Sequence, residues 1–285
     1  MKTIMSAVAG LTIAFAAPAF GQSAQERVDE TAAAVNAAVI EHGLAPVTEV
    51  DHARLAAAEG VEMPPSRVSI FSDPEINSRL LRQNVRAGLD LPFRVLSFSQ
   101  DGAPSAIYTS SSFLRLRHVL DDTDALAAFD DRLTPVLGAI ANPEPRPVPT
   151  TGLTRDFGII ELRSSHDTSI TVSKLKATIS AQPDTVWFGE MDFSAQAKAS
   201  GADIVPAVLL LFGGPAPGGV AMADFPSIGI DAFCQKLLVY ASPDGGSVVI
   251  FNDIAAMAEL HYGRSAPPHA ALNERLTATF SAAIK

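Results

Sequence analysis

The chain has 285 residues, of which 47% are hydrophobic and 18% charged, and its formal net charge at pH 7 is −10. Such an acidic balance excludes a general affinity for nucleic acid or for anionic membrane surfaces, so any anion site has to be local. The one cysteine, Cys234, excludes an internal disulfide and a metal site of the Cys-x-x-Cys type.

The first 21 residues have the features of a secretory signal peptide. Met1 and Lys2 give a short positive start, residues 4–17 are apolar or small, and residues 19–21 form a small-x-small cleavage site. The apolar run is too short for a stable transmembrane helix, and no later segment has the apolar length of one. We therefore expect a soluble mature protein that is periplasmic or secreted; a buried N-terminal helix is the alternative.

Residues 22–141 predict a first domain that mixes helices and strands. A helix is expected over 25–42, and strands are expected over 47–50, 67–71, 94–99 and 105–109. Proline then stands at every second position from Pro143 to Pro149, which favours an extended segment and excludes a helix. Residues 142–157 are therefore interpreted as a Pro-rich linker between two domains.

Residues 158–285 predict a second domain of the same kind. Strands are expected over 158–163, 185–191, 205–212, 234–240 and 247–251, and helices over 169–181, 194–200, 254–261 and 270–284. The glycine-rich segment 213–219 lacks the Lys-Ser/Thr that ends a nucleotide-binding P-loop, and two prolines remove amide donors from it. We interpret it as a tight loop.

An internal duplication relates the two domains. Residues 51–99 align with residues 192–240 at a constant shift of 141, with ten identities and no gap. Unrelated windows of this length share about three or four identities. The shift becomes 143 after a turn and holds through His118/His261. The chain therefore contains two copies of one domain. We expect these copies to pack on each other as an internal pseudo-dimer.

The duplication also predicts a gap in the first sheet. The counterpart of the strand at 159–163 falls at 18–22, across the expected cleavage site. The first domain then lacks its opening strand and has a sheet edge that needs cover. We expect the linker or the second domain to cover that edge.

The string Gly88-Leu89-Asp90-Leu91-Pro92, followed by a strand, a hairpin and His118, resembles the family called "domain of unknown function 302". The second copy repeats this order with Gly229-Ile230-Asp231, Asn252-Asp253 and His261. The resemblance covers nearly all of the mature chain. It implies an α+β fold in which a curved antiparallel sheet packs against helices, and single-copy members that dimerise. It implies no established activity, and the first copy departs from it with Thr109-Ser110 in place of Asn-Asp.

Aspartate and histidine at matching positions of the two copies form a candidate polar cluster. Carboxylates that follow a glycine bend can act as general bases, and histidines can carry protons. The alternative is structural: aspartates at turns accept backbone N–H groups, and histidines near helix ends interact with the last carbonyls. The candidate residues are Asp90, His118, Asp231, Asn252, Asp253 and His261.

Arginines distinguish the first copy from the second. Six arginines of the first copy have uncharged counterparts, and three of them, Arg79, Arg82 and Arg86, follow helical spacing. On one helix face they would form an anion-binding patch for a small ligand or an acidic partner. The alternative is a solvated helix face.

No motif with a known reaction is present. The chain lacks a Gly-x-Ser-x-Gly elbow, a His-Glu-x-x-His helix and a Gly-x-Gly-x-x-Gly fingerprint, so no metal and no cofactor are predicted. The sequence therefore favours an exported, non-catalytic binding or interaction module for a small molecule or a protein. One alternative is an enzyme that uses Asp231, His261 and Asn252-Asp253, and another is a purely structural domain without a sizeable pocket.

Overall fold

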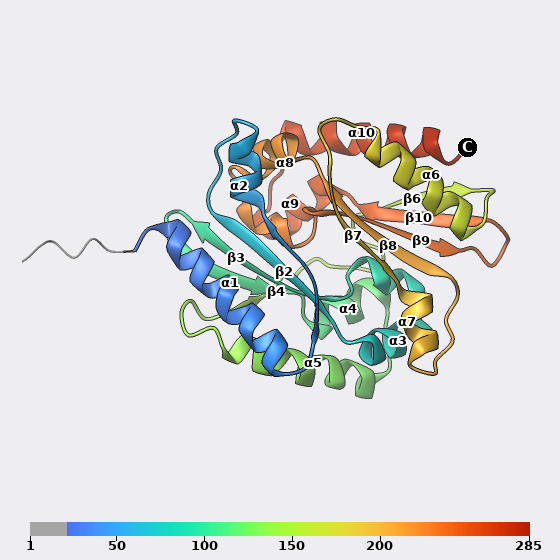
Figure 1. Cartoon of the computed structure of the whole chain (residues 1–285), viewed down its shortest axis with the longest axis horizontal. Helices are drawn as coiled ribbons and strands as arrows, with labels where there is room; N and C mark the ends of the chain where they lie inside the picture. Colours follow the sequence, from blue (N-terminus) through green and yellow to red (C-terminus); the bar gives the residue numbers. More distant parts are fainter. Residues whose placement is uncertain (1–21) are drawn as a thin grey trace, which may run out of the picture.

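The computed structural model describes residues 22–285, so the signal peptide expected over residues 1–21 lies outside the described residues. It contains two five-stranded sheets, with strand orders β1-β2-β3-β4-β5 and β6-β10-β9-β8-β7. Helices pack against the strands in both halves (Figure 1). The fold is α+β, as the sequence predicted, and both halves have the same order of elements.

The first repeat forms around a meander of four antiparallel strands. A capping box between Ser23 and Glu26 starts the first helix, and the Asp51 carboxylate caps the second. The elements are α1 (Ala24–Glu41), β1 (Ala45–Asp51), α2 (His52–Ala58), β2 (Ser66–Ser72), α3 (Pro74–Gln83), the 3₁₀ helix η1 (Val85–Leu89), β3 (Phe93–Gln100), β4 (Ala103–Tyr108), α4 (Ser111–His118) and α5 (Thr123–Gly138).

The second repeat has the same order with one more strand at its start. Asp192 caps its short helix as Asp51 does in the first repeat. The elements are β6 (Ile159–Ser164), α6 (Thr168–Ser180), β7 (Val186–Asp192), α7 (Phe193–Ala199), β8 (Ala207–Gly213), α8 (Pro215–Met222), η2 (Pro226–Ile230), β9 (Gln235–Ala241), β10 (Ser247–Asn252), α9 (Ile254–Tyr262) and α10 (Pro267–Ala283).

The linker covers the exposed edge of the first sheet. Its strand β5 (Arg146–Pro147) pairs in parallel with β4, at Ile107 and Tyr108. The place it occupies beside β4 is the place of β6 beside β10 in the second sheet. The expectation that the linker or the second domain protects this edge is confirmed, with the linker as the cover.

The interpretation of residues 213–219 as a tight loop is wrong over most of its length. Helix α8 begins at Pro215, and Gly214 is its N-cap residue. Proline has no amide hydrogen and a fixed φ, and both properties suit the first helical position, where the amide has no partner in the helix. The glycines at 218 and 219 are therefore helical, and they allow close approach of neighbouring elements.

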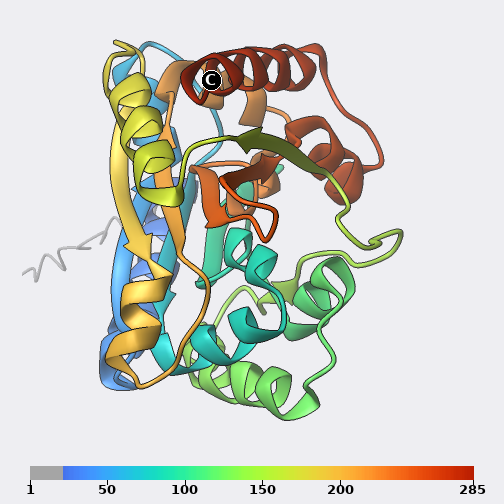
Figure 2. The same cartoon turned by 90° about the vertical axis from the view of Figure 1, so that its right-hand side faces the viewer.

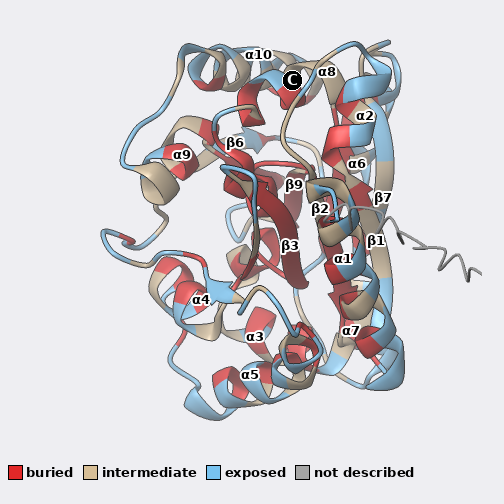
Figure 3. Cartoon of the chain, turned by 90° about the vertical axis from the view of Figure 1, so that its left-hand side faces the viewer, coloured by how far each residue is buried: buried red, intermediate tan, exposed pale blue. Residues whose placement is uncertain are grey.

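Matching elements join the two repeats. Helix α2 packs on α8 and α3 packs on α7, while η1 lies on β9 and η2 lies on β3. Each repeat thus inserts its glycine bend against the sheet of the other, and the edge strands β1 and β7 lie next to each other (Figure 2). The largest apolar cluster includes Phe93 and Leu96 of the first repeat and Leu209 and Leu238 of the second. Strands β3 and β9 are buried at the centre (Figure 3).

Among residues 22–285, no helix combines the length and the apolar character needed to cross a membrane.

A glycine-to-alanine substitution, which adds one methyl group, can test the contact between α2 and α8. A Cβ at Gly219 would lie 2.6 Å from the Cβ of Ala56 and 3.0 Å from a γ-carbon of Val61. We predict that Gly219→Ala lowers the free energy of unfolding by about 1–2 kcal/mol, because overpacking outweighs the better helix propensity of alanine. Urea titration measures this change.

Gly138→Ala is the matched control. Gly138 ends α5, and a Cβ there meets no atom within 4 Å. Its variant should be as stable as the wild type or more stable by up to about 1 kcal/mol. Equal stability of Gly219→Ala and the wild type would show that the two helices are not in close contact.

Candidate functional site

Asp90 and Asp231 occupy equivalent positions at the centre of the molecule. Each follows its 3₁₀ helix directly, and neither side chain has any exposed surface. Burial follows from the fold, because η1 and η2 each pack on a central strand of the other repeat. In the described chain neither carboxylate accepts a hydrogen bond from a nearby backbone amide, so the alternative interpretation as Asx turns is wrong.

Each buried aspartate pairs with the histidine of its own repeat. His118 Nε2 lies 2.7 Å from Asp90 Oδ2, and His261 Nε2 lies 2.9 Å from Asp231 Oδ2. Both histidines sit in the last turn of short helices, α4 and α9. The four residues proposed from the repeat pattern therefore meet in two equivalent pairs.

Two arginines neutralise Asp90. Arg117 Nη1 lies 2.7 Å from Asp90 Oδ2, and Arg94 Nη2 lies 3.2 Å from Asp90 Oδ1; neither arginine side chain is more than 1% exposed. Burial alone raises the pKa of Asp90, but the Arg117 charge and the His118 and Arg94 contacts outweigh it and hold the pKa far below the usual range. Asp90 is therefore a permanent buried anion.

The same arginines connect the repeats. Arg94 donates to the carbonyl of Ile230 at 2.8 Å, and Arg117 donates to Asn252 Oδ1 at 2.8 Å. Asn252 in turn donates to the carbonyl of Asp231 at 2.7 Å. Asn252, one of the candidate residues, thus links the network of the first repeat to the glycine bend of the second.

Lys236 adds a third buried basic side chain to this network. Its Nζ lies 4.0 Å from Asp90 Oδ1, its side chain is 2% exposed, and it has no hydrogen-bond partner among the described residues. Two buried aspartates and three buried basic side chains therefore meet at the centre of the protein.

His118 is closed off from solvent. Burial, the largest influence, lowers its pKa against the opposing effect of Asp90. Its Nδ1 atom is buried and has no partner in the described chain. The first Asp–His pair therefore has a structural role in the core.

His261, in contrast, forms a hydrogen bond with a serine and lines a pocket. Its Nδ1 lies 3.0 Å from Ser227 Oγ, so Asp231, His261 and Ser227 form one hydrogen-bonded chain. Ser227 and His261 line a cavity of about 220 Å³ between the repeats, which we call the interrepeat pocket. Its lining residues are Phe98, Gln100, Ile107, Arg146, Pro147, Pro149, Ser227, His261 and Tyr262.

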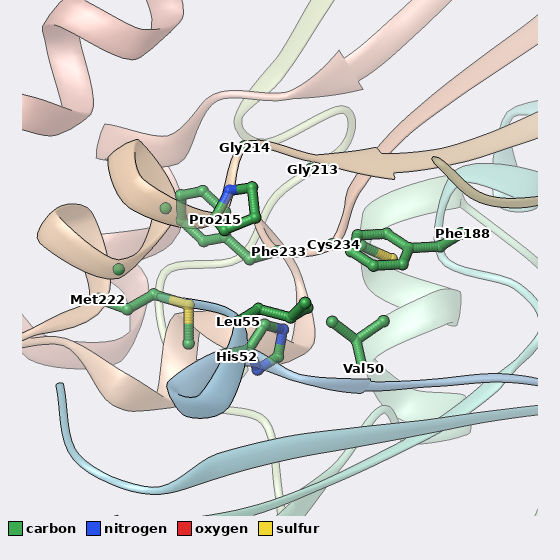
Figure 4. Close-up of a pocket in the computed structure, with 12 residues that line it drawn as sticks. Val50, His52, Leu55, Phe188, Gly213, Gly214, Pro215, Met222, Phe233 and Cys234 are labelled. Atoms are coloured by element: carbon green, nitrogen blue, oxygen red, sulfur yellow. The ribbon is translucent and has the colours of Figure 1, made fainter. Parts of the chain in front are cut away.

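A second pocket between the repeats is apolar (Figure 4). It has a volume of about 30 Å³, and His52 and Cys234 contribute its polar atoms among side chains such as Leu55, Phe188 and Met222. Burial raises the pKa of the Cys234 thiol to about 12, so the thiol stays protonated at neutral pH. His52 Nδ1 lies 3.2 Å from Ser66 Oγ, and its Nε2 has no partner among the described residues.

Asp253 does not join the polar cluster. Its carboxylate caps α9 by accepting the amide of Ala256 at 3.0 Å, and it accepts a hydrogen bond from Asn273 at 2.6 Å. An aspartate before a helix satisfies the first free amides, which explains this placement.

The expectation that Arg79, Arg82 and Arg86 share one helix face is wrong. Helix α3 ends at Gln83, and the extended backbone of Asn84 turns the chain so that Arg86 belongs to η1. Arg86 contacts the carboxylates of Asp156 in the linker and Glu161 in the second repeat, at 2.9 and 2.5 Å. Arg79 lies 4.0 Å from Asp122, and Arg82 is exposed. The structure therefore does not assemble these arginines into one anion site.

Sequence reasoning missed four residues of the centre: Arg94, Arg117, Ser227 and Lys236. The alignment of the two repeats includes the positions of the first three. Arg94 and Arg117 belong to the six arginines without a charged counterpart, and Ser227 is the counterpart of Arg86. No pattern in the sequence distinguished buried members of that set from exposed ones.

Within residues 22–285, no three side chains of His, Cys, Asp or Glu come together as a metal site requires.

Comparisons with known proteins give a family and partial relatives. A sequence model of the family described as "Domain of unknown function DUF302" matches residues 20–140 and 160–283. Similar proteins include the "Fluoride-specific ion channel FluC 1" of Brucella suis biovar 1 and of Brucella abortus biovar 1, each 30% identical over 106 residues. The match covers 37% of this chain and only 41% and 38% of those relatives.

A solved structure is also similar, described as "Crystal structure of uncharacterized conserved protein DUF302 from Bacillus stearothermophilus". The likeness covers 45% of this chain and 98% of that chain, with 16% identity and a TM-score of 0.37.

The buried His52 predicts a dependence of stability on pH. Burial lowers its pKa from 6.5 to about 4, so between these values the unfolded chain binds a proton that the folded chain does not. This contribution to stability is present above pH 6.5 and is lost as the pH falls to 4. Its size is about 3 kcal/mol.

His52→Phe should remove that contribution, since phenylalanine occupies the equivalent position, Phe193, in the second repeat. Urea titrations at pH 4 to 7 should give a shallower decline of the free energy of unfolding for the variant than for the wild type. Parallel curves would contradict the assignment.

Proposed function

Since the chain belongs to the DUF302 family and carries that domain twice in tandem, we propose that it is an exported protein that binds a small anionic ligand in the interrepeat pocket. Export, to the periplasm or beyond the cell, is supported by the features of residues 1–21. The ligand class is supported by the polar groups of the pocket.

One observation carries the proposal: Arg146 lines a pocket that also holds His261 and Tyr262. The side chain of Arg146 is exposed, and it forms no ion pair within residues 22–285. A guanidinium without a protein partner matches the planar, two-oxygen geometry of a carboxylate. Phe98 and Ile107 supply apolar walls, as ligand pockets usually have.

The tandem arrangement builds this pocket. Arg146 comes from the linker strand β5, Gln100 and Phe98 from β3, and His261 from α9 of the second repeat. Because the net charge of −10 repels anions over the general surface, an anion site needs such a local cation. A single repeat contains only part of this set.

An enzymatic function and fluoride binding are also to be tested. An enzymatic function is the second candidate, and the hydrogen bond between Ser227 and His261 favours it. The Brucella relatives are named as fluoride-specific channels, and this chain spans about two fifths of their length. Fluoride is therefore one of the anions to be tested.

We predict that acetate raises the melting temperature of the protein with residues 22–285, because a ligand that binds only the folded form stabilises it. Inorganic phosphate and fluoride are the comparison anions. Arg146→Gln should weaken acetate binding at least about tenfold in isothermal titration, because the charge-assisted hydrogen bonds are lost.

Arg163→Gln serves as the control, since Arg163 is an exposed arginine of β6 that does not line the pocket. This variant should bind acetate as the wild type does. The proposal is overturned if none of the three anions binds, or if Arg146→Gln binds as tightly as the wild type.

A further inference from the structure

We propose that Ser227 is a nucleophile, that His261 is its general base and that Asp231 orients the histidine, so that the interrepeat pocket cleaves esters of small carboxylic acids. This inference rests on the proposed function, because the acid released by cleavage is the kind of anion assigned to Arg146. It deepens that function by naming a substrate class and a reaction.

The hydrogen-bond chain has the order that nucleophilic catalysis requires. His261 Nε2–H donates to Asp231 Oδ2 at 2.9 Å, because a carboxylate can only accept. Nδ1 is then free to accept from the Ser227 hydroxyl at 3.0 Å. The two ring nitrogens are used in the reverse of the most familiar order. Roles depend on geometry and not on which nitrogen faces the serine, and both distances lie within hydrogen-bond reach.

Asp231 can stabilise a histidine cation because its own charge is less neutralised than that of Asp90. Arg94 Nη1 lies 3.8 Å from Asp231 Oδ1, and that oxygen has no hydrogen-bond partner among the described residues. Within residues 22–285, His261 is therefore the one hydrogen-bonded partner of this carboxylate. When His261 takes a proton, the positive charge arises 2.9 Å from a buried anion.

The first repeat has the equivalent Asp–His pair but no serine at the position of Ser227. Arg86 stands at the position of Ser227, and its guanidinium contacts Asp156 and Glu161 instead of His118. Nδ1 of His118 is buried and has no partner in the described chain. The second repeat therefore combines the serine with a histidine that lines a pocket, although the His261 side chain is only 2% exposed.

A second serine–histidine pair provides an internal comparison. Ser66 Oγ lies 3.2 Å from His52 Nδ1, but Ser66 is fully buried and no carboxylate of the described residues accepts a hydrogen bond from His52. The adjoining pocket is apolar and holds no arginine. This pair lacks the orienting acid, and Ser66 does not line the pocket, so the pair should be unreactive.

The proposed reaction balances in two steps. Ser227 Oγ gives its proton to His261 Nδ1 and bonds to the ester carbonyl carbon; the leaving alkoxide takes that proton and departs as an alcohol. Water then gives a proton to His261 and its oxygen bonds to the same carbon, and Ser227 Oγ leaves with the proton. The products are the alcohol and the carboxylic acid. Arg146 lines the pocket and can stabilise the negative oxygen of each tetrahedral intermediate, whereas the Tyr262 hydroxyl already donates to Gln100 Oε1 at 3.3 Å.

The direct test treats the wild-type protein with a fluorophosphonate probe and maps the modified residue by peptide mass spectrometry. Covalent modification of Ser227 is the expected result, and it requires no variant that could misfold. Lack of modification in the folded protein, or modification of another residue instead of Ser227, overturns the inference.

Hydrolysis of p-nitrophenyl acetate gives the second readout. Ser227→Ala and His261→Gln should each lower the rate at least about 100-fold, whereas Ser66→Ala should leave it unchanged. Circular dichroism checks that each variant is folded. Equal rates of Ser227→Ala and the wild type also overturn the inference.

The two proposals can fail separately. Ser227→Ala keeps Arg146, so it should still bind acetate in isothermal titration. Acetate binding without modification of Ser227 leaves the binding function standing and removes the esterase. Modification of Ser227 in a protein that binds no acetate has the opposite meaning.

Discussion

The ion pair between Arg117 and Asp90 is the constraint on which the arrangement of the two repeats depends. Neither side chain is exposed, and the shortest N–O distance is 2.7 Å. A buried carboxylate is costly unless it is paired and hydrogen-bonded, so the fold has to bring cations to it. Arg117 meets this need and also donates to Asn252 of the second repeat and to the carbonyls of Phe157 and Gly158. One guanidinium therefore fixes the first repeat, the end of the linker and the second repeat together.

This arrangement explains why duplicated halves have different roles. The first repeat supplies Arg94 and Arg117, and with these cations its own Asp–His pair becomes part of a closed core. The second repeat has Gln235 and Leu260 at those positions, and its Asp–His pair reaches Ser227 and the interrepeat pocket. In a symmetric dimer of single domains both centres would be alike. Because both copies lie in one chain, the centre of the first repeat can stabilise the fold while the histidine of the second repeat bonds a serine at a pocket.

The sequence predicted the fold well and the centre in part. A constant shift between repeats placed Asp90 with His118 and Asp231 with His261, because equivalent residues of two copies occupy equivalent places. The cover of the open sheet edge followed from the missing strand. The roles of the arginines did not follow, since Arg117 contacts a residue 135 positions away and its burial depends on how the repeats pack. Local spacing likewise could not show that Asn84 ends the helix before Arg86.

The most direct test of this account is a double-mutant cycle between Asp90 and Arg117, measured as free energies of unfolding in urea. Asp90→Asn should lower the free energy of unfolding by about 3–5 kcal/mol, because it leaves Arg117 without an ion-pair partner. Arg117→Leu, chosen because Leu260 is its counterpart, should lower it by a similar or smaller amount, because Asp90 keeps Arg94 at 3.2 Å. The double variant should be less destabilised than the sum of the two, by about 2 kcal/mol or more. Strictly additive losses would contradict a central ion pair that holds the repeats together.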